Sequence, residues 1–167
     1  LGALKAMAPL PRFRGIDLEV ACDVVTLFAD AASVFGPQKG ASSAQIALLT
    51  RRLDRLAEIY QREHGVAVGS LPRSGAAGGL GGGLAAAGAS LRDGFELIAE
   101  EVDLYGQIEA VDLVVTGEGA LDDTSFEGKV VGGVLRLAEA AGVAVVAVVG
   151  SAAPTPKRDW PIEVIDL

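Results

Sequence analysis

Cysteine and histidine are almost absent from this sequence of 167 residues, which has one of each, Cys22 and His64. One cysteine excludes an internal disulfide and a multi-cysteine zinc site, and one histidine excludes a metal site built on a histidine pair. So little cysteine is typical of a reducing compartment, and we expect the cytoplasm. Since no uninterrupted apolar run of about 18 residues occurs, we expect neither a membrane span nor a membrane partner.

Basic and aromatic residues are scarce as well. Lys and Arg number 14 against 22 Asp and Glu, which gives a formal charge of −8, and aromatic residues make up 5%. The shortage of cations argues against nucleic acid as a partner, because binding to its phosphate backbone depends on Lys and Arg. It does not exclude phosphate chemistry, since backbone N–H groups and one or two lysines suffice for a small anion.

Small apolar residues and glycine are abundant instead. Hydrophobic residues make up 50% of the chain and glycine occurs 22 times, a composition typical of α/β proteins. The length suits a single domain. We expect a flank over residues 1–15 and an α/β segment over residues 16–167, with both ends continuing in a longer protein.

The N-terminal half predicts one strand, one loop and one long helix. Residues 16–25 are rich in β-branched side chains, which favours a buried strand, and the glycines and proline of residues 36–40 predict a loop. Ser42 followed by Gln45 has the spacing of a capping box, and a helix is expected up to Gly65. Its apolar stripe comprises Ile46, Leu49, Leu53, Leu56 and Tyr60, and its solvated face is expected to carry Arg51, Arg52 and Arg55.

Residues 75–88 form a tract of glycine and alanine interrupted by two leucines. Two interpretations stay open. Either a helix packs closely against a sheet, where only Gly and Ala let the backbones approach, or the tract forms a loop whose N–H groups bind an anion. It is not a Walker loop, because no Gly-Lys-Ser/Thr follows.

The C-terminal half has the pattern of a βαβ unit with parallel strands. After short helices over residues 95–102 and 104–110, we expect a strand over 111–116, a helix over 129–141 ended by Gly142, and strands over 143–149 and 162–165. The first strand leads into an acidic loop over residues 117–123, and Gly150 and Ser151 follow the next. Ligands bind beyond the carboxyl ends of strands in such sheets, so the acidic loop is expected to face one.

The acidic loop offers the groups that phosphoryl transfer needs. Glu118, Asp122 and Asp123 are carboxylates of the kind that hold Mg²⁺, and Lys129 supplies a nearby cation. Alternatively, Asp122 or Asp123 only caps the following helix. Glycines on both sides of Glu118 keep its surroundings uncrowded, which favours a ligand that approaches the backbone.

Asp23 and Lys39 are candidates in the N-terminal half. Asp23 closes the first strand, at what we expect to be the same sheet edge as the acidic loop. It either approaches a metal or an acceptor hydroxyl or only occupies a turn at the strand end. Lys39, which follows Gln38 in the Gly/Pro loop, either pairs with a carboxylate or phosphate or is a solvated surface lysine.

Four motifs occur in order along the chain. They are Val-Ala-Cys-Asp-Val over residues 20–24, Phe-Gly-Pro-Gln-Lys-Gly-Ala over 35–41, Gly-Ala-Ala-Gly-Gly-Leu-Gly over 75–81, and Asp-Leu-Val-Val-Thr-Gly-Glu-Gly over 112–119, with Asp122 and Gly128-Lys129 after it. Together they resemble the glycerate kinase family of bacterial sugar-acid pathways. The resemblance covers residues 19–150, which correspond to the middle of a family member.

The resemblance implies a two-domain α/β fold with a mostly parallel sheet and flanking helices. It also implies ATP- and Mg²⁺-dependent phosphorylation of D-glycerate, a small hydroxy acid, commonly to 2-phosphoglycerate. The implied catalytic residues are Asp23, Lys39 and Asp122, with Gln38 and Lys39 on the substrate and Glu118 and Asp122 on the metal. The implied nucleotide and phosphate contacts are Gly75, Gly78, Gly79, Gly117, Gly119 and Lys129.

Some family features are missing. The stretch between Asp23 and the Phe-Gly-Pro-Gln-Lys motif is short, Thr124 and Ala120 replace the usual Gln and basic residue, and terminal family segments are absent. We expect a partial enzyme that a longer gene product or a second chain completes, and as its partner either further copies in a homo-oligomer or that missing part. The alternative is a non-catalytic α/β remnant or ligand-binding module of the same ancestry. A nucleotide-cofactor oxidoreductase is disfavoured, because no strand leads into Gly-x-Gly-x-x-Gly.

Overall fold

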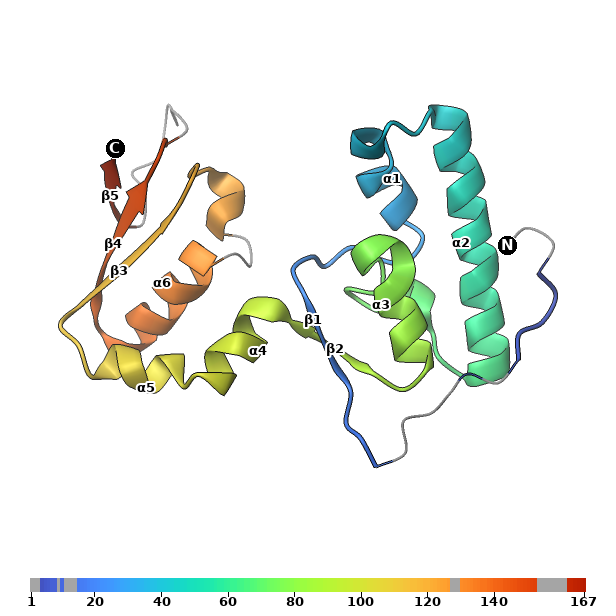
Figure 1. The fold of residues 1–167 in the computed structure, drawn as a ribbon, viewed down its shortest axis with the longest axis horizontal. Helices are drawn as coiled ribbons and strands as arrows, with labels where there is room; N and C mark the ends of the chain where they lie inside the picture. The colour runs from blue at the N-terminus through green and yellow to red at the C-terminus, as the bar shows by residue number, and fades with distance from the viewer. Residues whose placement is uncertain (1–3, 9, 11–14, 127–129, 153–161) are drawn as a thin grey trace. The chain divides into compact units, whose positions relative to one another are not determined.

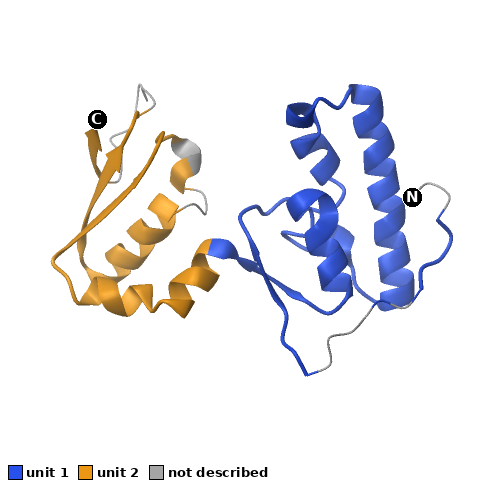
Figure 2. Ribbon diagram, in the orientation of Figure 1, with its two compact units in different colours: residues 1–94 blue, residues 95–167 orange. Residues whose placement is uncertain are grey.

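The computed structural model describes residues 4–8, 10, 15–126, 130–152 and 162–167 (Figure 1). They belong to two compact units, unit 1 over residues 1–94 and unit 2 over residues 95–167 (Figure 2). Each unit combines a parallel sheet with helices, so the α/β fold class is confirmed. The division into a flank over 1–15 and one segment over 16–167 stays a prediction. Within the described ranges, no helix is both long and apolar enough to cross a membrane.

Unit 1 is built on a two-stranded parallel sheet. β1 (Glu19–Cys22) pairs with β2 (Ser90–Asp93), and Cys22 lies opposite Asp93. The strand predicted over residues 16–25 is therefore shorter than expected, because β2 offers only four residues for pairing. Sequence reasoning did not find β2, since its Ser-Leu-Arg-Asp sequence contains a single apolar side chain.

The helices of unit 1 lie between β1 and β2 in the sequence. They are α1 (Ala31–Phe35), α2 (Ser43–His64) and α3 (Ala76–Ala86), with 3₁₀ turns at Pro37–Lys39 and Val68–Ser70. The loop predicted over residues 36–40 thus contains a 3₁₀ turn, because Pro37 fixes a helical φ at its start. Gly40 ends the turn at a φ of 78°, a conformation that favours glycine.

The predicted capping box at the start of α2 is confirmed. The Gln45 N–H donates to Ser42 Oγ at 3.3 Å, and the Ser42 N–H donates to Gln45 Oε1 at 2.8 Å. The helix ends at Gly65, which has a φ of 72° and whose N–H donates to the Gln61 carbonyl at 3.1 Å. These bonds satisfy backbone groups that a helix leaves unpaired at its ends.

The apolar stripe of α2 is well buried only in its second half. Tyr60 meets Phe28 edge to face, with ring centroids 6.1 Å apart, in a core cluster with Val68. Leu49, in the first half, is 41% exposed. The 5 residues of α1 and 11 of α3 are too few to cover the 22 of α2. Of the three arginines predicted on the solvated face, Arg51 is exposed, whereas Arg52 and Arg55 are half-buried, and the Nε of Arg52 is inaccessible.

The glycine tract packs against the core as α3. A Cβ on Gly82 would lie 2.6 Å from Phe28 Cε2, and a Cβ on Gly79 would lie 3.0 Å from the same atom. Phe28 is only 1% exposed, so its ring fills the space that these glycines leave. The glycines are closely packed at these two positions, but against a side chain from a turn and not against a sheet, so the predicted helix-on-sheet contact is not what these two glycines make.

Unit 2 contains the predicted βαβ unit. Its elements are α4 (Gly94–Glu101), α5 (Leu104–Glu109), β3 (Leu113–Glu118), the 3₁₀ turn Asp123–Phe126, α6 (Val130–Ala141), β4 (Ala144–Val149) and β5 (Glu163–Asp166). β4 pairs in parallel with β3 and with β5. Gly142 follows α6 with a φ of 72°, as expected for a glycine that ends a helix.

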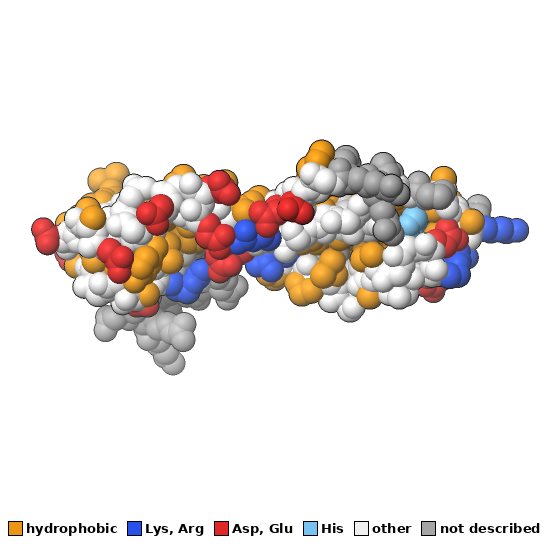
Figure 3. All heavy atoms as spheres, turned by 90° about the horizontal axis from the view of Figure 1, so that it is seen from below, with side chains coloured by type: hydrophobic (Ala, Val, Ile, Leu, Met, Phe, Trp, Pro, Cys, Tyr) orange, Lys and Arg blue, Asp and Glu red, His pale blue; other side chains and the backbone are white. Residues whose placement is uncertain are grey.

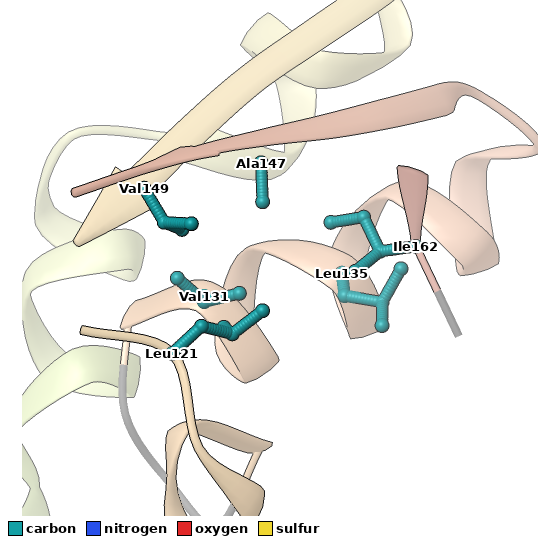
Figure 4. Close-up of a cluster of buried hydrophobic side chains, with 6 residues drawn as sticks. All are labelled: Leu121, Val131, Leu135, Ala147, Val149 and Ile162. Atoms are coloured by element: carbon teal, nitrogen blue, oxygen red, sulfur yellow. The ribbon is translucent and has the colours of Figure 1, made fainter. Parts of the chain in front are cut away.

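The core of unit 2 lies between its sheet and α6 (Figure 4). Val131 and Leu135 of α6 cluster with Ala147 and Val149 of β4. Leu121 joins them from the loop after β3 and is 1% exposed. The acidic loop is therefore anchored in the core by its own side chain.

Replacing Ser42 by alanine should lower the free energy of unfolding by about 1 kcal/mol, because the Gln45 N–H loses its acceptor. Ser43→Ala is the matched control, since Ser43 is the first helical residue and takes no part in the capping box. Urea unfolding followed by circular dichroism measures both variants. Equal losses would contradict the capping role.

Gly82→Ala should destabilise the protein by about 1–3 kcal/mol, because the added methyl overlaps the buried Phe28 ring. Gly83→Ala is the matched control on the same helix, since its Cβ would have the Tyr60 Oη as nearest atom at 3.4 Å. Thermal unfolding compares the two. A Gly82→Ala variant as stable as Gly83→Ala would show that the ring does not need this glycine.

Candidate active site

Charged side chains gather at the carboxyl end of the β1–β2 sheet. Asp23 follows β1 directly and is exposed. Asp93 ends β2, and its Oδ2 accepts from Arg73 Nη2 at 3.0 Å. The side chains of this ion pair are 24% exposed for Arg73 and 16% for Asp93, so solvent screens the pair only partly.

Cys22 lies within the field of these charges. Burial raises the pKa of its thiol, Arg73 lowers this pKa, and Asp23 and Asp93 raise it again, with a net upward direction. The residue is 3% exposed. A buried thiol that stays neutral is a poor nucleophile, so Cys22 has a packing role.

The start of the glycine tract lies against the chain that follows Asp23. The Gly75 N–H donates to the Thr26 carbonyl at 2.9 Å. A Cβ on Gly75 would overlap the Leu27 carbonyl oxygen, so only glycine fits there. The structure therefore brings the segment after Asp23 and the first predicted phosphate-binding glycine together.

The next residues form a left-handed turn. Ala77, Gly78 and Gly79 have φ values of 50°, 74° and 104°, and the N–H groups of Gly78 and Gly79 both donate to the Gly75 carbonyl. These donors are therefore used within the turn. Because a Cβ on Gly78 would meet no atom within 4 Å, a ligand has room to approach its backbone. Anion binding by the tract stays a prediction.

Gln38 and Lys39 are exposed in the 3₁₀ turn before α2. Lys39 lines a pocket of about 390 Å³ together with the first half of α2, including Arg52. Asp23 is not among the described residues that line this pocket. The expectation that Lys39 and Asp23 meet one substrate stays a prediction.

Glu118 ends β3 between two glycines with different roles. A Cβ on Gly117 would overlap the Val148 carbonyl oxygen of the neighbouring strand, whereas a Cβ on Gly119 would meet nothing within 4 Å. The Oε1 of Glu118 is buried and has no hydrogen-bond partner among the described residues. A buried carboxylate oxygen in this condition is costly unless a ligand or ion pairs with it.

The loop after β3 is tied to the end of β4. The Gly150 N–H donates to the Glu118 carbonyl at 3.3 Å, and the Leu121 N–H donates to the Ser151 carbonyl at 2.9 Å. The prediction that Gly150 and Ser151 share an edge with the acidic loop is therefore confirmed. Parallel pairing of β3 with β4 brings these strand ends together.

A buried serine holds the backbone of Asp122. The Asp122 N–H donates to Ser125 Oγ at 3.0 Å, and the Ser125 N–H donates to the Asp122 carbonyl at 3.0 Å. Ser125 is fully buried, while Asp122 is exposed. Lys129, a predicted nucleotide contact, lies outside the described residues.

One expectation about the site is wrong. Asp23 follows a strand of the two-stranded sheet of unit 1, whereas Glu118 and Asp122 belong to the β3–β4–β5 sheet of unit 2. The three acids were expected at one sheet edge, but they lie at the edges of two sheets. The strand pattern shows which strands exist and does not show how they divide between sheets.

Glu118 and Asp122 are carboxylates of the chemical type that magnesium prefers. Mg²⁺ is usually held by one or two carboxylates, while waters and substrate phosphates complete its shell. In the part of the chain that the structure describes, no three His, Cys, Asp or Glu side chains cluster as a complete metal site. Two carboxylates suit an ion that phosphates also hold, and the Glu118 oxygen without a partner among the described residues is compatible with one; Mg²⁺ binding at Glu118 and Asp122 stays a prediction.

The sequence analysis did not find the ion pair of Arg73 and Asp93 at the carboxyl end of the β1–β2 sheet. Their ion pair depends on the unpredicted strand β2 and on Arg73 at a φ of 70°. The signal that could have found them is the Leu-Arg-Asp-Gly order of residues 91–94, in which an apolar residue leads into an Asp-Gly strand end.

Alkylation of Cys22 by iodoacetamide should be slower in the native chain than in urea at every pH between about 8 and 10, because the folded thiol has the higher pKa. Since Arg73 lowers this pKa, Arg73→Gln should move the native rate profile to higher pH. Arg92→Gln, on the ion pair with Glu19, is the matched control. Mass spectrometry follows the single cysteine, and a native profile that coincides with the urea profile would refute the prediction.

Comparison with known proteins places these features in a family. The family model described as "Glycerate kinase family" matches residues 3–160. The chain is 41% identical over 160 residues to a glycerate kinase of Halalkalibacterium halodurans, a match that covers 90% of the chain and 42% of the relative. It is also 41% identical over 145 residues to the glycerate 2-kinase of Escherichia coli K12, covering 84% of the chain and 38% of the relative.

A solved structure agrees with the sequence comparisons. The crystal structure of a candidate glycerate kinase 2 from Salmonella typhimurium LT2 superposes with a TM-score of 0.69 at 36% identity, over 90% of this chain and 40% of that one. The chain thus spans about two fifths of the relatives it matches. With a family match over nearly its whole length and these site features at its strand ends, the chain belongs to the glycerate kinase family.

Proposed function

We propose that the chain carries part of the machinery for phosphorylating D-glycerate with ATP, giving phosphoglycerate and ADP. The observation that carries this proposal is the family match over residues 3–160. The Glu118 oxygen at the end of β3, which is buried and has no partner among the described residues, supports it, since a phosphate-bound cation would pair with that oxygen. The single, buried cysteine suits the reducing cytoplasm, which is the compartment we propose.

Unit 1 is proposed to bind the hydroxy acid. Lys39 supplies a cation for its carboxylate or for the transferred phosphoryl group, and Gln38 is an exposed hydrogen-bonding neighbour. Asp23, exposed at the end of β1, is the proposed acceptor of the proton from the attacking hydroxyl. Gly75, Gly78 and Gly79 stay the proposed phosphate-binding glycines, and Gly78 would be the point of approach, because it alone of the three has open space beside its backbone. The N–H groups of all three already donate within the protein, so a phosphate would have to share or displace those bonds.

Unit 2 is proposed to bind the nucleotide phosphates and Mg²⁺. Glu118 and Asp122 would hold the ion, and the uncrowded backbone at Gly119 would let a phosphate approach. Gly117 supports this arrangement by allowing close pairing with β4, and Lys129 remains a proposed phosphate contact. When bound, Mg²⁺ neutralises the charge that develops on the transferred phosphoryl group.

Asp122→Ala and Lys39→Ala should each lower the rate of ADP release at least about 100-fold, because phosphoryl transfer depends on such positioned charges. The assay couples ADP release to NADH oxidation with ATP, Mg²⁺ and D-glycerate, on the longest protein that contains this chain. Asp112→Asn and Arg55→Gln are the matched controls, since Asp112 precedes the other end of β3 and Arg55 pairs with Glu58. Turnover that survives both Ala substitutions would overturn the assignment.

A further inference from the structure

The pocket beside Lys39 has an unusual charge for this protein. It has a volume of about 390 Å³ and lies where the Pro37–Lys39 turn meets the first half of α2. Two cations, Lys39 and Arg52, line it, and no Asp or Glu is among its described lining residues. The chain as a whole carries a formal charge of −8, and acidic side chains recur over the surface drawn in Figure 3. The pocket is therefore a local positive site on a negative protein.

Arg52 is held differently from a solvated surface arginine. Its Nε is buried and has no hydrogen-bond partner among the described residues. Arg55, one turn further along α2, instead pairs with Glu58 at 2.7 Å. Arg52 lines the pocket, and no carboxylate among the described lining residues competes for its charge, so an anion in the pocket would pair with this cation. The start of α2 adds a smaller favourable field, since Gln45 of its first turn and Ala41, which precedes the cap residue Ser42, also line the pocket.

The shape and lining of the pocket favour a small ligand with two negative groups. Lys39 and Arg52 come from different elements, so each can pair with a separate anionic group. Leu48 and Leu49, 39% and 41% exposed, provide an apolar wall between polar contacts. No aromatic side chain is among the described lining residues, so the pocket offers no platform for a nucleotide base.

We propose that Arg52 is a further anion-binding residue, and that it forms with Lys39 a site for a phosphorylated hydroxy acid, whose carboxylate and phosphate pair with the two cations. This inference rests on the proposed function, which places Lys39 beside the hydroxy acid. It adds a second cation from α2 and a preference for the phosphorylated product over the unphosphorylated acid, because only the product carries both groups.

The test is calorimetric titration of the 167-residue chain with 2-phosphoglycerate, without nucleotide or Mg²⁺. Arg52→Gln should weaken binding about tenfold or more, the effect of removing one hydrogen bond to a charged group. Arg55→Gln, the matched control on the same helix, should change the dissociation constant less than about twofold, as its partner lies outside the pocket. D-glycerate should bind more weakly than 2-phosphoglycerate, and added ATP should not compete.

A second measurement does not depend on the folding of a variant. In the unsubstituted chain, 2-phosphoglycerate should shift the Nε–H NMR signal of Arg52 and leave that of Arg55 in place. No binding, an unmoved Arg52 signal, or equal affinities of the two Gln variants would each overturn the proposal. Failure of the proposed function looks different: phosphoglycerate would still bind through Arg52, but ADP release would be absent.

Discussion

The fit of the glycine tract around Phe28 is the contact on which unit 1 depends. Gly79 and Gly82 leave room for the Phe28 ring, which is 1% exposed. Gly75 lies against the backbone of the segment after Asp23, where the Cβ of any other residue would overlap the Leu27 carbonyl oxygen. Between these packed glycines the chain makes the left-handed turn at residues 77–79. These contacts place the start of the predicted phosphate-binding loop against the segment that follows Asp23.

In unit 2, different contacts hold the loop that carries the predicted acidic residues. There the loop that carries Asp122 is fixed by the buried side chain of Leu121 and by the bonds of the Ser125 hydroxyl and N–H. Gly117 lets β3 approach β4 closely. The next residue, Glu118, ends β3 and has one side-chain oxygen buried. In both units, small residues position acids at the carboxyl ends of parallel strands, the usual place for ligands in such sheets.

Local signals were sufficient to predict most elements. The capping box at Ser42, the helix end at Gly142 and the βαβ unit all depend on short-range patterns, and all are confirmed. Strand β2 was not predicted, because its four residues contain one apolar side chain and therefore show no alternation of apolar and polar residues. Other features depend on contacts between distant segments, which composition and periodicity do not encode. These features are the sheet to which the strand before Asp23 belongs, the Arg73–Asp93 ion pair and the burial of the Arg52 Nε.

The central claim is that these strand ends serve phosphoryl transfer to a hydroxy acid. Phosphorus NMR of the longest protein that contains this chain, incubated with ATP, Mg²⁺ and D-glycerate, tests it most directly, because the spectrum shows where the phosphoryl group goes. The account predicts a growing phosphate monoester signal in step with ADP. Formation of ADP with inorganic phosphate alone, or an unchanged ATP spectrum, would contradict it.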